Sequence, residues 1–281
     1  MSTYLNSTFQ SDNPQHVSAL DELPVWSAAF GQLLLETVPL KQNINALDIG
    51  YGTGYPVIEL AERSGESCRF YGVDIWRQGA QRARQKISVH GLKNLTLVLG
   101  RAENLPFHNE YFDLITSNNG LNNVEDLEKS LTECFRACMK SGRLIFTINL
   151  PETMKEFYAI FESVLKNHQL QNVVEKMKQH IYQKRKPLSE MCKMVEHAGF
   201  TVDQKIEKSF SYRFVDGTTM LNYFLIREFF LPAWKDIIPE QNASSVFEDI
   251  ENRLNQLSKE KGELVLTIPF VCVDCVKPPV A

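Results

Sequence analysis

The chain has 281 residues, of which 43% are hydrophobic and 23% charged, so it can bury a sizeable core and does not have the composition of a disordered protein. Its formal net charge of -4 argues against nucleic acid as the main partner, because binding a phosphate backbone needs a positive surface. We expect a cytoplasmic protein, since no signal-peptide core or apolar run of about 20 residues is visible and six cysteines are too few for a disulfide framework.

The first half of the chain alternates short apolar runs with amphipathic segments. Residues 1–20 are polar and are interpreted as an arm, and a helix is predicted over 24–38. Alternating strands and helices of this kind favour a parallel sheet with right-handed crossovers. The expected strands are 46–49, 69–73, 95–99, 112–116 and 143–148, and the expected helices are 57–63, 78–89 and 124–139.

The pattern changes after Pro151. The expected elements there are helices at 152–166, 170–184 and 188–198, a strand at 201–214, a helical aromatic-rich stretch at 216–260 and a last strand at 263–275. We therefore predict an α/β fold with a doubly wound, mostly parallel seven-stranded sheet and helical additions.

The strongest motif is the turn Asp48-Ile49-Gly50-Tyr51-Gly52-Thr53-Gly54, which joins the first strand to a helix. Glycines let a backbone approach a ligand closely, and a helix start presents unpaired N–H groups to it. A dinucleotide turn of the form G-x-G-x-x-G would need glycine at position 55, which is Tyr55. Taken alone, the motif leaves open a tight turn that binds nothing.

Three further segments follow in order. Phe70-Tyr71-Gly72-Val73-Asp74 ends the second strand with an acid, which suits either a ribose contact or a helix N-cap. The segment 100–107 follows the third strand, and 111–120 spans the fourth strand and the loop after it. A single motif is weak, whereas four in the right order are far more specific.

Together these elements resemble class I S-adenosylmethionine-dependent methyltransferases over about residues 45–150. They are most similar to the type 11 branch, which includes quinone-biosynthesis methyltransferases. The resemblance implies cofactor contacts at Asp48, Gly50, Gly52, Gly54, Asp74, Ile75, Ala102, Glu103 and Asn118. Many relatives have an acid where this chain has Arg101, so Glu103 or backbone groups are expected to read the adenine edge.

Residues that contact the acceptor are predicted less directly. Asn119 and Asn122 follow the fourth strand, where they suit either a substrate or turn chemistry, and Trp26 lies on the first predicted helix. Together with Tyr4, Phe9 and Phe30, the stretch 216–240 and Trp26 are expected to wall an apolar pocket. No general base is identified, because a methyl transfer needs one only when the nucleophile is protonated.

The remaining polar clusters are interpreted without a ligand. The histidines have no metal-ligand spacing, and Cys272 and Cys275 lie on a predicted strand with their side chains on opposite faces, so we expect no metal. A basic cluster is interpreted as a solvated helix face, with phosphate contact as the open alternative. It comprises Lys176, Lys178, Lys184, Arg185 and Lys186.

The chain is thus predicted to transfer a methyl group from S-adenosylmethionine to a small, partly apolar molecule. The alternatives are a nicotinamide-dependent oxidoreductase and a protein that binds S-adenosylmethionine without catalysis. The expected division is an N-terminal arm and helix at 1–40, a cofactor-binding core at 41–150, and the rest of the same sheet at 151–281 with a helical lid insertion near 216–260. Neither the acceptor atom nor the oligomeric state follows from the sequence.

Overall fold

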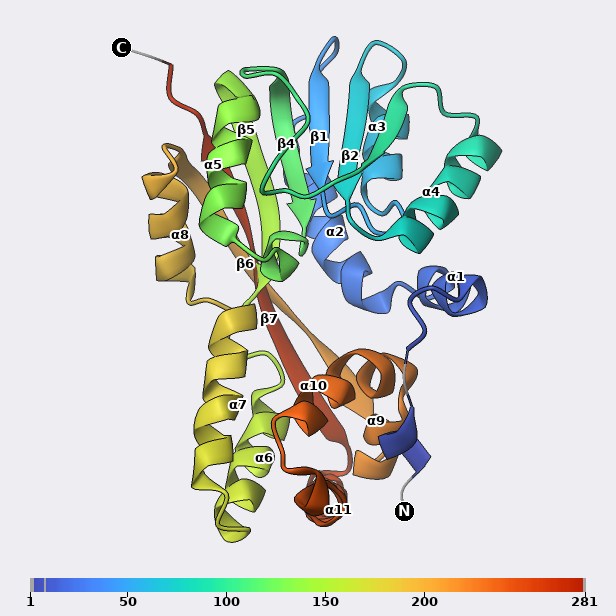
Figure 1. Cartoon of the computed structure of the whole chain (residues 1–281), viewed down its shortest axis with the longest axis vertical. Coiled ribbons are helices and arrows are strands. Elements are labelled where there is room, and N and C mark those ends of the chain that lie inside the picture. Colours follow the sequence, from blue (N-terminus) through green and yellow to red (C-terminus); the bar gives the residue numbers. More distant parts are fainter. Residues whose placement is uncertain (1–2, 8, 280–281) are drawn as a thin grey trace. The chain divides into compact units, whose positions relative to one another are not determined.

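The computed structural model describes residues 3–7 and 9–279. Its sheet has seven strands in the order β3-β2-β1-β4-β5-β7-β6, and Figure 1 shows β2, β1, β4 and β5 side by side. β1 pairs in parallel with β2 and β4, β2 with β3, and β4 with β5, whereas β7 is antiparallel to β5. The predicted mostly parallel seven-stranded sheet is therefore confirmed. The strands are β1 (Asn45–Ile49), β2 (Arg69–Asp74), β3 (Leu95–Leu99), β4 (Phe112–Asn118), β5 (Cys138–Asn149), β6 (Thr201–Phe214) and β7 (Leu264–Val276).

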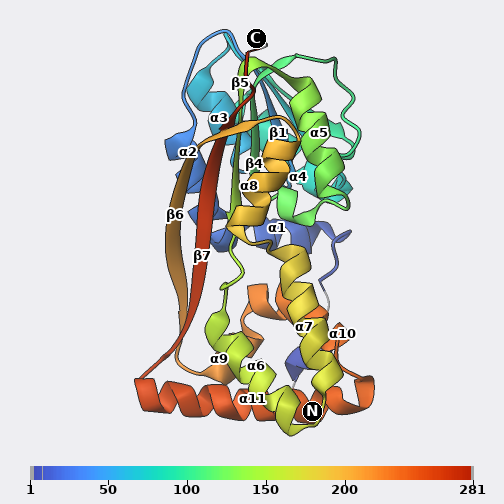
Figure 2. The same ribbon diagram turned by 90° about the vertical axis from the view of Figure 1, so that its left-hand side faces the viewer.

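The central strands are buried along nearly their whole length, as expected for strands covered on both faces. Helices α2 (Val25–Thr37) and α3 (Val57–Ser64) lie on one face of the sheet, and α5 (Leu127–Ala137) and α8 (Leu188–His197) lie on the other (Figure 2). Helix α4 (Arg77–His90) connects β2 to β3. This arrangement agrees with the predicted doubly wound fold.

The chain forms two compact units. The sheet unit comprises Ser11–Asn149, Pro187–Lys208 and the residues from Phe270 onward, and the helical unit comprises the residues up to Gln10, Leu150–Lys186 and Ser209–Pro269. The elements of the helical unit are η1 (Thr3–Asn6), α6 (Lys155–Asn167), α7 (Gln171–Lys184), α9 (Gly217–Asn222), the π-helix η3 (Ile226–Phe230), α10 (Leu231–Asp236) and α11 (Glu240–Lys261).

The core of the helical unit is aromatic. Trp234 stacks on Phe157 with ring centroids 3.9 Å apart, and its Nε1 donates to the Tyr158 hydroxyl at 3.0 Å. Phe9 of the arm packs against Phe229 of η3, with ring centroids 4.5 Å apart. Part of the aromatic stretch predicted around 216–260 therefore packs as the core of this unit.

Residues 1–20 are interpreted from the sequence as an arm, and the structure adds a helix there, α1 (Pro14–Glu22). Its start is conventional, with Asn13 Oδ1 accepting a bond from the Gln15 N–H at 2.9 Å and Pro14 in the first turn. Val17 is the buried residue of this helix, so the sequence has almost no apolar periodicity from which the helix could be predicted.

Two boundaries around β5 also differ from the prediction. Helix α5 begins at Leu127 rather than at 124, because Asp126 caps it by accepting a bond from the Lys129 N–H at 2.9 Å. Strand β5 begins at Cys138, which pairs with Phe112, and an irregularity in β4 between Phe112 and Leu114 shifts the register there.

Candidate cofactor site

The glycine turn leaves β1 at the centre of the sheet. Gly50, Gly52 and Gly54 all have positive φ, at 78°, 52° and 109°. The Gly50 N–H still donates to the Val73 carbonyl at 2.8 Å, which keeps the start of the turn attached to β2. The strand order reverses between β1 and β4, and ligands of open α/β sheets bind at the carboxyl ends of the strands at such a point.

Asp74, at the end of β2, holds the turn to the next helix. Its Oδ2 accepts a hydrogen bond from the Gly52 N–H at 2.7 Å, and its Oδ1 accepts one from the Trp76 N–H at 2.8 Å. Each carboxylate oxygen has a second lone pair, so both can still accept bonds from hydroxyl groups. The side chain of the next residue, Ile75, is 69% exposed and therefore accessible to a planar ring.

Asp48 is a buried acid one residue before the end of β1. It is 1% exposed, and its Oδ1 accepts a bond from the Thr116 hydroxyl at 2.6 Å. Its Oδ2 is buried and has no hydrogen-bond partner within residues 3–7 and 9–279. Burial raises the pKa of Asp48 to about 7, the Thr116 bond opposes this rise, and the nearby charge of Asp74 adds to it. Near neutral pH this carboxyl is therefore divided between its two protonation states.

We expect Asp48→Asn to remove a pH dependence of stability. A carboxyl whose folded-state pKa is about 7, against an ordinary value of 3.8, destabilises the fold progressively as the pH rises through that interval. In denaturant unfolding, the free energy of unfolding of the variant should rise relative to that of the natural chain between pH 5 and pH 8, by an amount on the order of a few kcal/mol. The exposed Asp12→Asn is the control, and an equal stability difference at both pH values would contradict the raised pKa.

The segment 100–107, which is predicted to contact the adenine, forms hydrogen bonds that fix the loop before α5. Glu103 is 9% exposed, and its Oε1 accepts bonds from the backbone N–H groups of Glu125 and Asp126 at 2.8 and 3.2 Å. Arg101 pairs with the Glu125 carboxylate, and its Nε lies 3.7 Å from Glu103 Oε2. Glu103 therefore holds the start of α5, and Arg101 belongs to the same cluster. Ala102, between them, is buried.

The asparagines after β4 lie beside the glycine turn. The Ser117 hydroxyl donates to the Ile49 carbonyl at 2.8 Å, which joins the ends of β4 and β1. Asn118 Nδ2 donates to the Ser27 carbonyl at 3.1 Å, and its Oδ1 accepts from the Thr147 hydroxyl at 2.9 Å. The Asn118 side chain is thus engaged at both ends, which leaves its backbone as the group that can face a ligand.

Asn122 organises the rest of this loop. Its Nδ2 donates to Asn119 Oδ1 and, at 2.7 Å, to Asn149 Oδ1 at the end of β5. Asn119 has a positive φ of 60°, a conformation that asparagine adopts more readily than most residues. Both turn chemistry and a polar surface for a ligand are therefore present in the same loop.

Trp26 lies on α2, which packs against the residue that follows the turn. The Tyr55 hydroxyl donates to the Ala28 carbonyl at 3.3 Å, and a Cβ on Gly31 would lie only 2.2 Å from Tyr55 Cε1. The Trp26 ring contacts Phe30 at 5.3 Å, and Phe30 contacts Phe270 at 4.7 Å. Helix α2 thus places Trp26 near the glycine turn on an aromatic support.

A family model described as a methyltransferase domain matches residues 40–208 of this chain. The chain belongs to this methyltransferase family. The match covers the glycine turn, Asp74 and the loop after β4, and it confirms the predicted family and S-adenosylmethionine as its cofactor. It does not favour the nicotinamide alternative.

Similar proteins agree with this assignment. The chain is 31% identical over 135 residues to a demethylmenaquinone methyltransferase of Anoxybacillus flavithermus, covering 47% of this chain and 57% of that protein. It is 35% identical over 112 residues to a ubiquinone/menaquinone biosynthesis C-methyltransferase of Proteus mirabilis, covering 40% and 45%. The matches therefore span about half the length of these curated relatives. A solved structure from Bacillus halodurans has the same fold, with a TM-score of 0.59, 20% identity, and coverage of 89% of this chain and 100% of that one.

Helix α1, which the sequence did not predict, contacts the glycine turn and α4. The Asp21 carboxylate accepts bonds from Arg82 at 2.7 Å and Lys86 at 2.5 Å on α4, and also from Thr53 in the glycine turn. Burial alone would raise the pKa of Asp21, but the bonds from Lys86, Thr53 and Arg82 lower it below its usual value. Because Trp76 Nε1 also donates to the Ser11 carbonyl at 2.8 Å, α1 is fixed beside the turn at both of its ends.

Asp21→Asn should release α1 without unfolding the sheet unit. The charged pairs with Arg82 and Lys86 are lost, and one neutral acceptor remains for Thr53, so we expect a loss of about 1–2 kcal/mol in the free energy of unfolding. Hydrogen exchange of residues 13–22 should accelerate at least severalfold. Glu22→Gln, at an exposed neighbouring acid, is the control, and unchanged exchange in Asp21→Asn would show that these pairs do not hold the helix.

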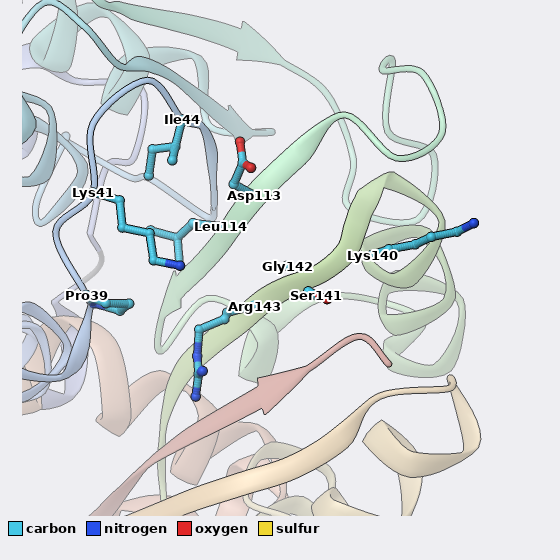
Figure 3. Close-up of a pocket in the computed structure, with 9 residues that line it drawn as sticks. All are labelled: Pro39, Lys41, Ile44, Asp113, Leu114, Lys140, Ser141, Gly142 and Arg143. Carbon is cyan, nitrogen blue, oxygen red and sulfur yellow. The ribbon is translucent and has the colours of Figure 1, made fainter. Parts of the chain in front are cut away.

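A hollow at the opposite edge of the sheet is separate from this site (Figure 3). It lies at the starts of β1, β4 and β5 and includes none of the predicted cofactor residues. Its volume of about 220 Å³ is below the roughly 300–1,000 Å³ of typical ligand pockets. Figure 3 shows Lys140 extending away from the other labelled side chains. Neither its position nor its size suits the cofactor. It is lined by Pro39, Lys41, Ile44, Asp113, Leu114, Lys140, Ser141, Gly142 and Arg143.

Other features bear on metals and membranes. In the described part of the chain, no group of three or more His, Cys, Asp or Glu side chains is placed to hold a metal ion. All six cysteines are free, Cys272 and Cys275 included. No helix among residues 3–7 and 9–279 is both long enough and apolar enough to cross a membrane.

Proposed function

We propose that this chain transfers a methyl group from S-adenosylmethionine to a small, partly apolar acceptor. The observation that carries the proposal is the hydrogen bond from the Gly52 N–H to Asp74, which joins the glycine turn to the acid at the end of β2. In this assignment Asp74 binds the ribose hydroxyls, the exposed Ile75 covers the adenine, and Asp48 and the glycines surround the methionine part.

The contacts of the adenine edge are assigned to backbone groups of the segment around Ala102. The carboxylate of Glu103 already accepts bonds from two N–H groups before α5, and Arg101 neutralises its other side. We therefore propose Glu103 as the residue that shapes this segment, and Asn118 as a contact through its main chain.

For the acceptor we propose contacts with Trp26, Asn119 and Asn122. The names of the curated relatives refer to demethylmenaquinone and to ubiquinone/menaquinone biosynthesis, which supports a partly apolar acceptor. We also keep the proposed division at 1–40, 41–150 and 151–281, and the cytoplasm as the compartment, supported by the free cysteines.

Transfer from a sulfonium is an in-line displacement whose leaving group needs no proton, so positioning supplies much of the rate. No side chain is assigned as a general base. Asn119 and Asn122, bonded to each other and to Asn149, would orient the acceptor rather than deprotonate it.

The test is incubation of the purified chain with methyl-labelled S-adenosylmethionine and a cell extract, followed by identification of the labelled product. Calorimetry with S-adenosylhomocysteine and with NADH runs in parallel. Binding of the first and a labelled small molecule support the proposal. Binding without any labelled product would favour a non-catalytic cofactor-binding protein, and preference for NADH would overturn the assignment.

A further inference from the structure

Arg185 is a buried cation at the end of α7 in the helical unit. It is 4% exposed, which contradicts its interpretation as part of a solvated basic face, although Lys176, Lys178 and Lys184 are exposed as predicted. Its Nη1 donates to the Thr153 carbonyl at 3.3 Å, and its Cζ lies 5.3 Å from the centre of the Tyr158 ring. No carboxylate of residues 3–7 or 9–279 forms an ion pair with it.

Burial of an unpaired guanidinium is costly, because the charge loses its hydration and its five N–H donors need acceptors. Two other partly shielded arginines of this chain have carboxylate partners. Arg143 pairs with Asp274 and Asp203, and Arg136 pairs with Glu133. In the described part of the chain, Arg185 instead has a carbonyl and an aromatic face as its partners, which compensate a buried charge incompletely.

Two further groups near Arg185, His180 and Tyr158, supply no counterion. Burial, followed by the charges of Arg185 and Lys184, lowers the pKa of His180, so its ring is neutral near pH 7. Its Nδ1 is buried and has no hydrogen-bond partner in the described part of the chain. The Tyr158 hydroxyl accepts the bond from Trp234 Nε1 at 3.0 Å, which leaves its own proton available to donate.

We propose that the helical unit binds, at Arg185, the carboxylate or phosphate group of a partly apolar small molecule. The charge of the ligand replaces the missing counterion, and the aromatic layer of Phe157, Tyr158 and Trp234 lies next to it. This anion site lies within the helical unit and does not rest on the proposed methyl transfer.

The competing account gives Arg185 a purely structural role. A cation at a helix C-terminus is favoured by the helix dipole, and a cation over an aromatic ring gains further stabilisation. On that account, substitution of Arg185 changes stability and leaves the binding of small anions unaltered. The two accounts therefore differ in a measurable quantity.

The test uses the full chain and three probes of similar shape: benzoate, phenyl phosphate and neutral benzamide. We expect calorimetry to detect at least one anion, with benzamide about tenfold weaker or more, and Arg185→Gln to weaken the bound anion by a similar factor. The control is Arg213→Gln, at an exposed arginine of the same unit that pairs with Glu263, and it should leave anion binding unchanged. Benzoate and phenyl phosphate distinguish a carboxylate from a phosphate site.

A second measurement uses the natural chain, so it does not depend on correct folding of the Arg185→Gln variant. The NMR signal of the Arg185 Nε–H, identified by its loss in Arg185→Lys, should shift with the bound anion and not with benzamide. The proposal is overturned if neither anion binds, if benzamide binds equally well, if Arg185→Gln retains full affinity, or if the signal does not move. Failure to bind S-adenosylhomocysteine would instead sink the proposed function, since that ligand tests the sheet unit.

Discussion

Asp74→Ala is expected to weaken the binding of S-adenosylmethionine by about tenfold or more. A loss of that size corresponds to the free energy of a good pair of hydrogen bonds. Two losses contribute. The carboxylate can no longer accept bonds from the ribose hydroxyls, and the N–H groups of Gly52 and Trp76 lose the acceptor that joins the turn to α4. Calorimetry with S-adenosylhomocysteine measures the sum.

A ligand lacking the ribose hydroxyls separates the two losses. If Asp74 binds the ribose, the natural chain should prefer S-adenosylhomocysteine over its 2′,3′-dideoxy analogue, and Asp74→Ala should lose most of that preference. If Asp74 only shapes the turn, the variant should bind both ligands more weakly by the same factor. An unchanged dissociation constant would contradict both roles. Asp12→Ala, at an exposed acid, serves as the control.

The positions of the strands along the chain and the glycine turn could be predicted because both are local properties of the sequence. Apolar runs such as Asn45–Ile49 and Phe112–Asn118 form central strands that are buried on both faces, and the apolar run is the direct signal of such burial. The three turn glycines stand where the backbone takes positive φ. The family assignment then needed only that these motifs follow one another in the correct order.

Features that depend on partners far along the chain could not be predicted. Helix α1 has one buried apolar residue, and it is held by Asp21 contacts to Arg82 and Lys86, more than sixty positions away. Glu103 carries no sequence sign that it accepts bonds from the backbone before α5. Arg185 was grouped with neighbouring lysines by composition, yet its burial is set by tertiary packing.

Substitutions of the turn glycines should affect the stability of the fold and the affinity for the cofactor differently. At Gly52 the φ of 52° lies in the left-handed region that other residues tolerate, and an added Cβ would meet no atom within 4 Å. At Gly54 the φ is 109°, and the Cβ would lie 2.5 Å from Ile58 Cδ1. We expect Gly54→Ala to lower the free energy of unfolding by about 1–3 kcal/mol and Gly52→Ala by about 1 kcal/mol.

Cofactor affinity should follow a different order. If the backbone at Gly52 approaches the cofactor, its methyl group would occupy space that the ligand needs, and Gly52→Ala should weaken S-adenosylhomocysteine binding about tenfold or more. Gly91→Ala is the matched control, because Gly91 has a φ of 69° in the left-handed region and equally open surroundings at the end of α4. It should cost similar stability and leave affinity unchanged. If Gly52→Ala binds S-adenosylhomocysteine as tightly as the natural chain does, the turn shapes the fold without contacting the cofactor at Gly52.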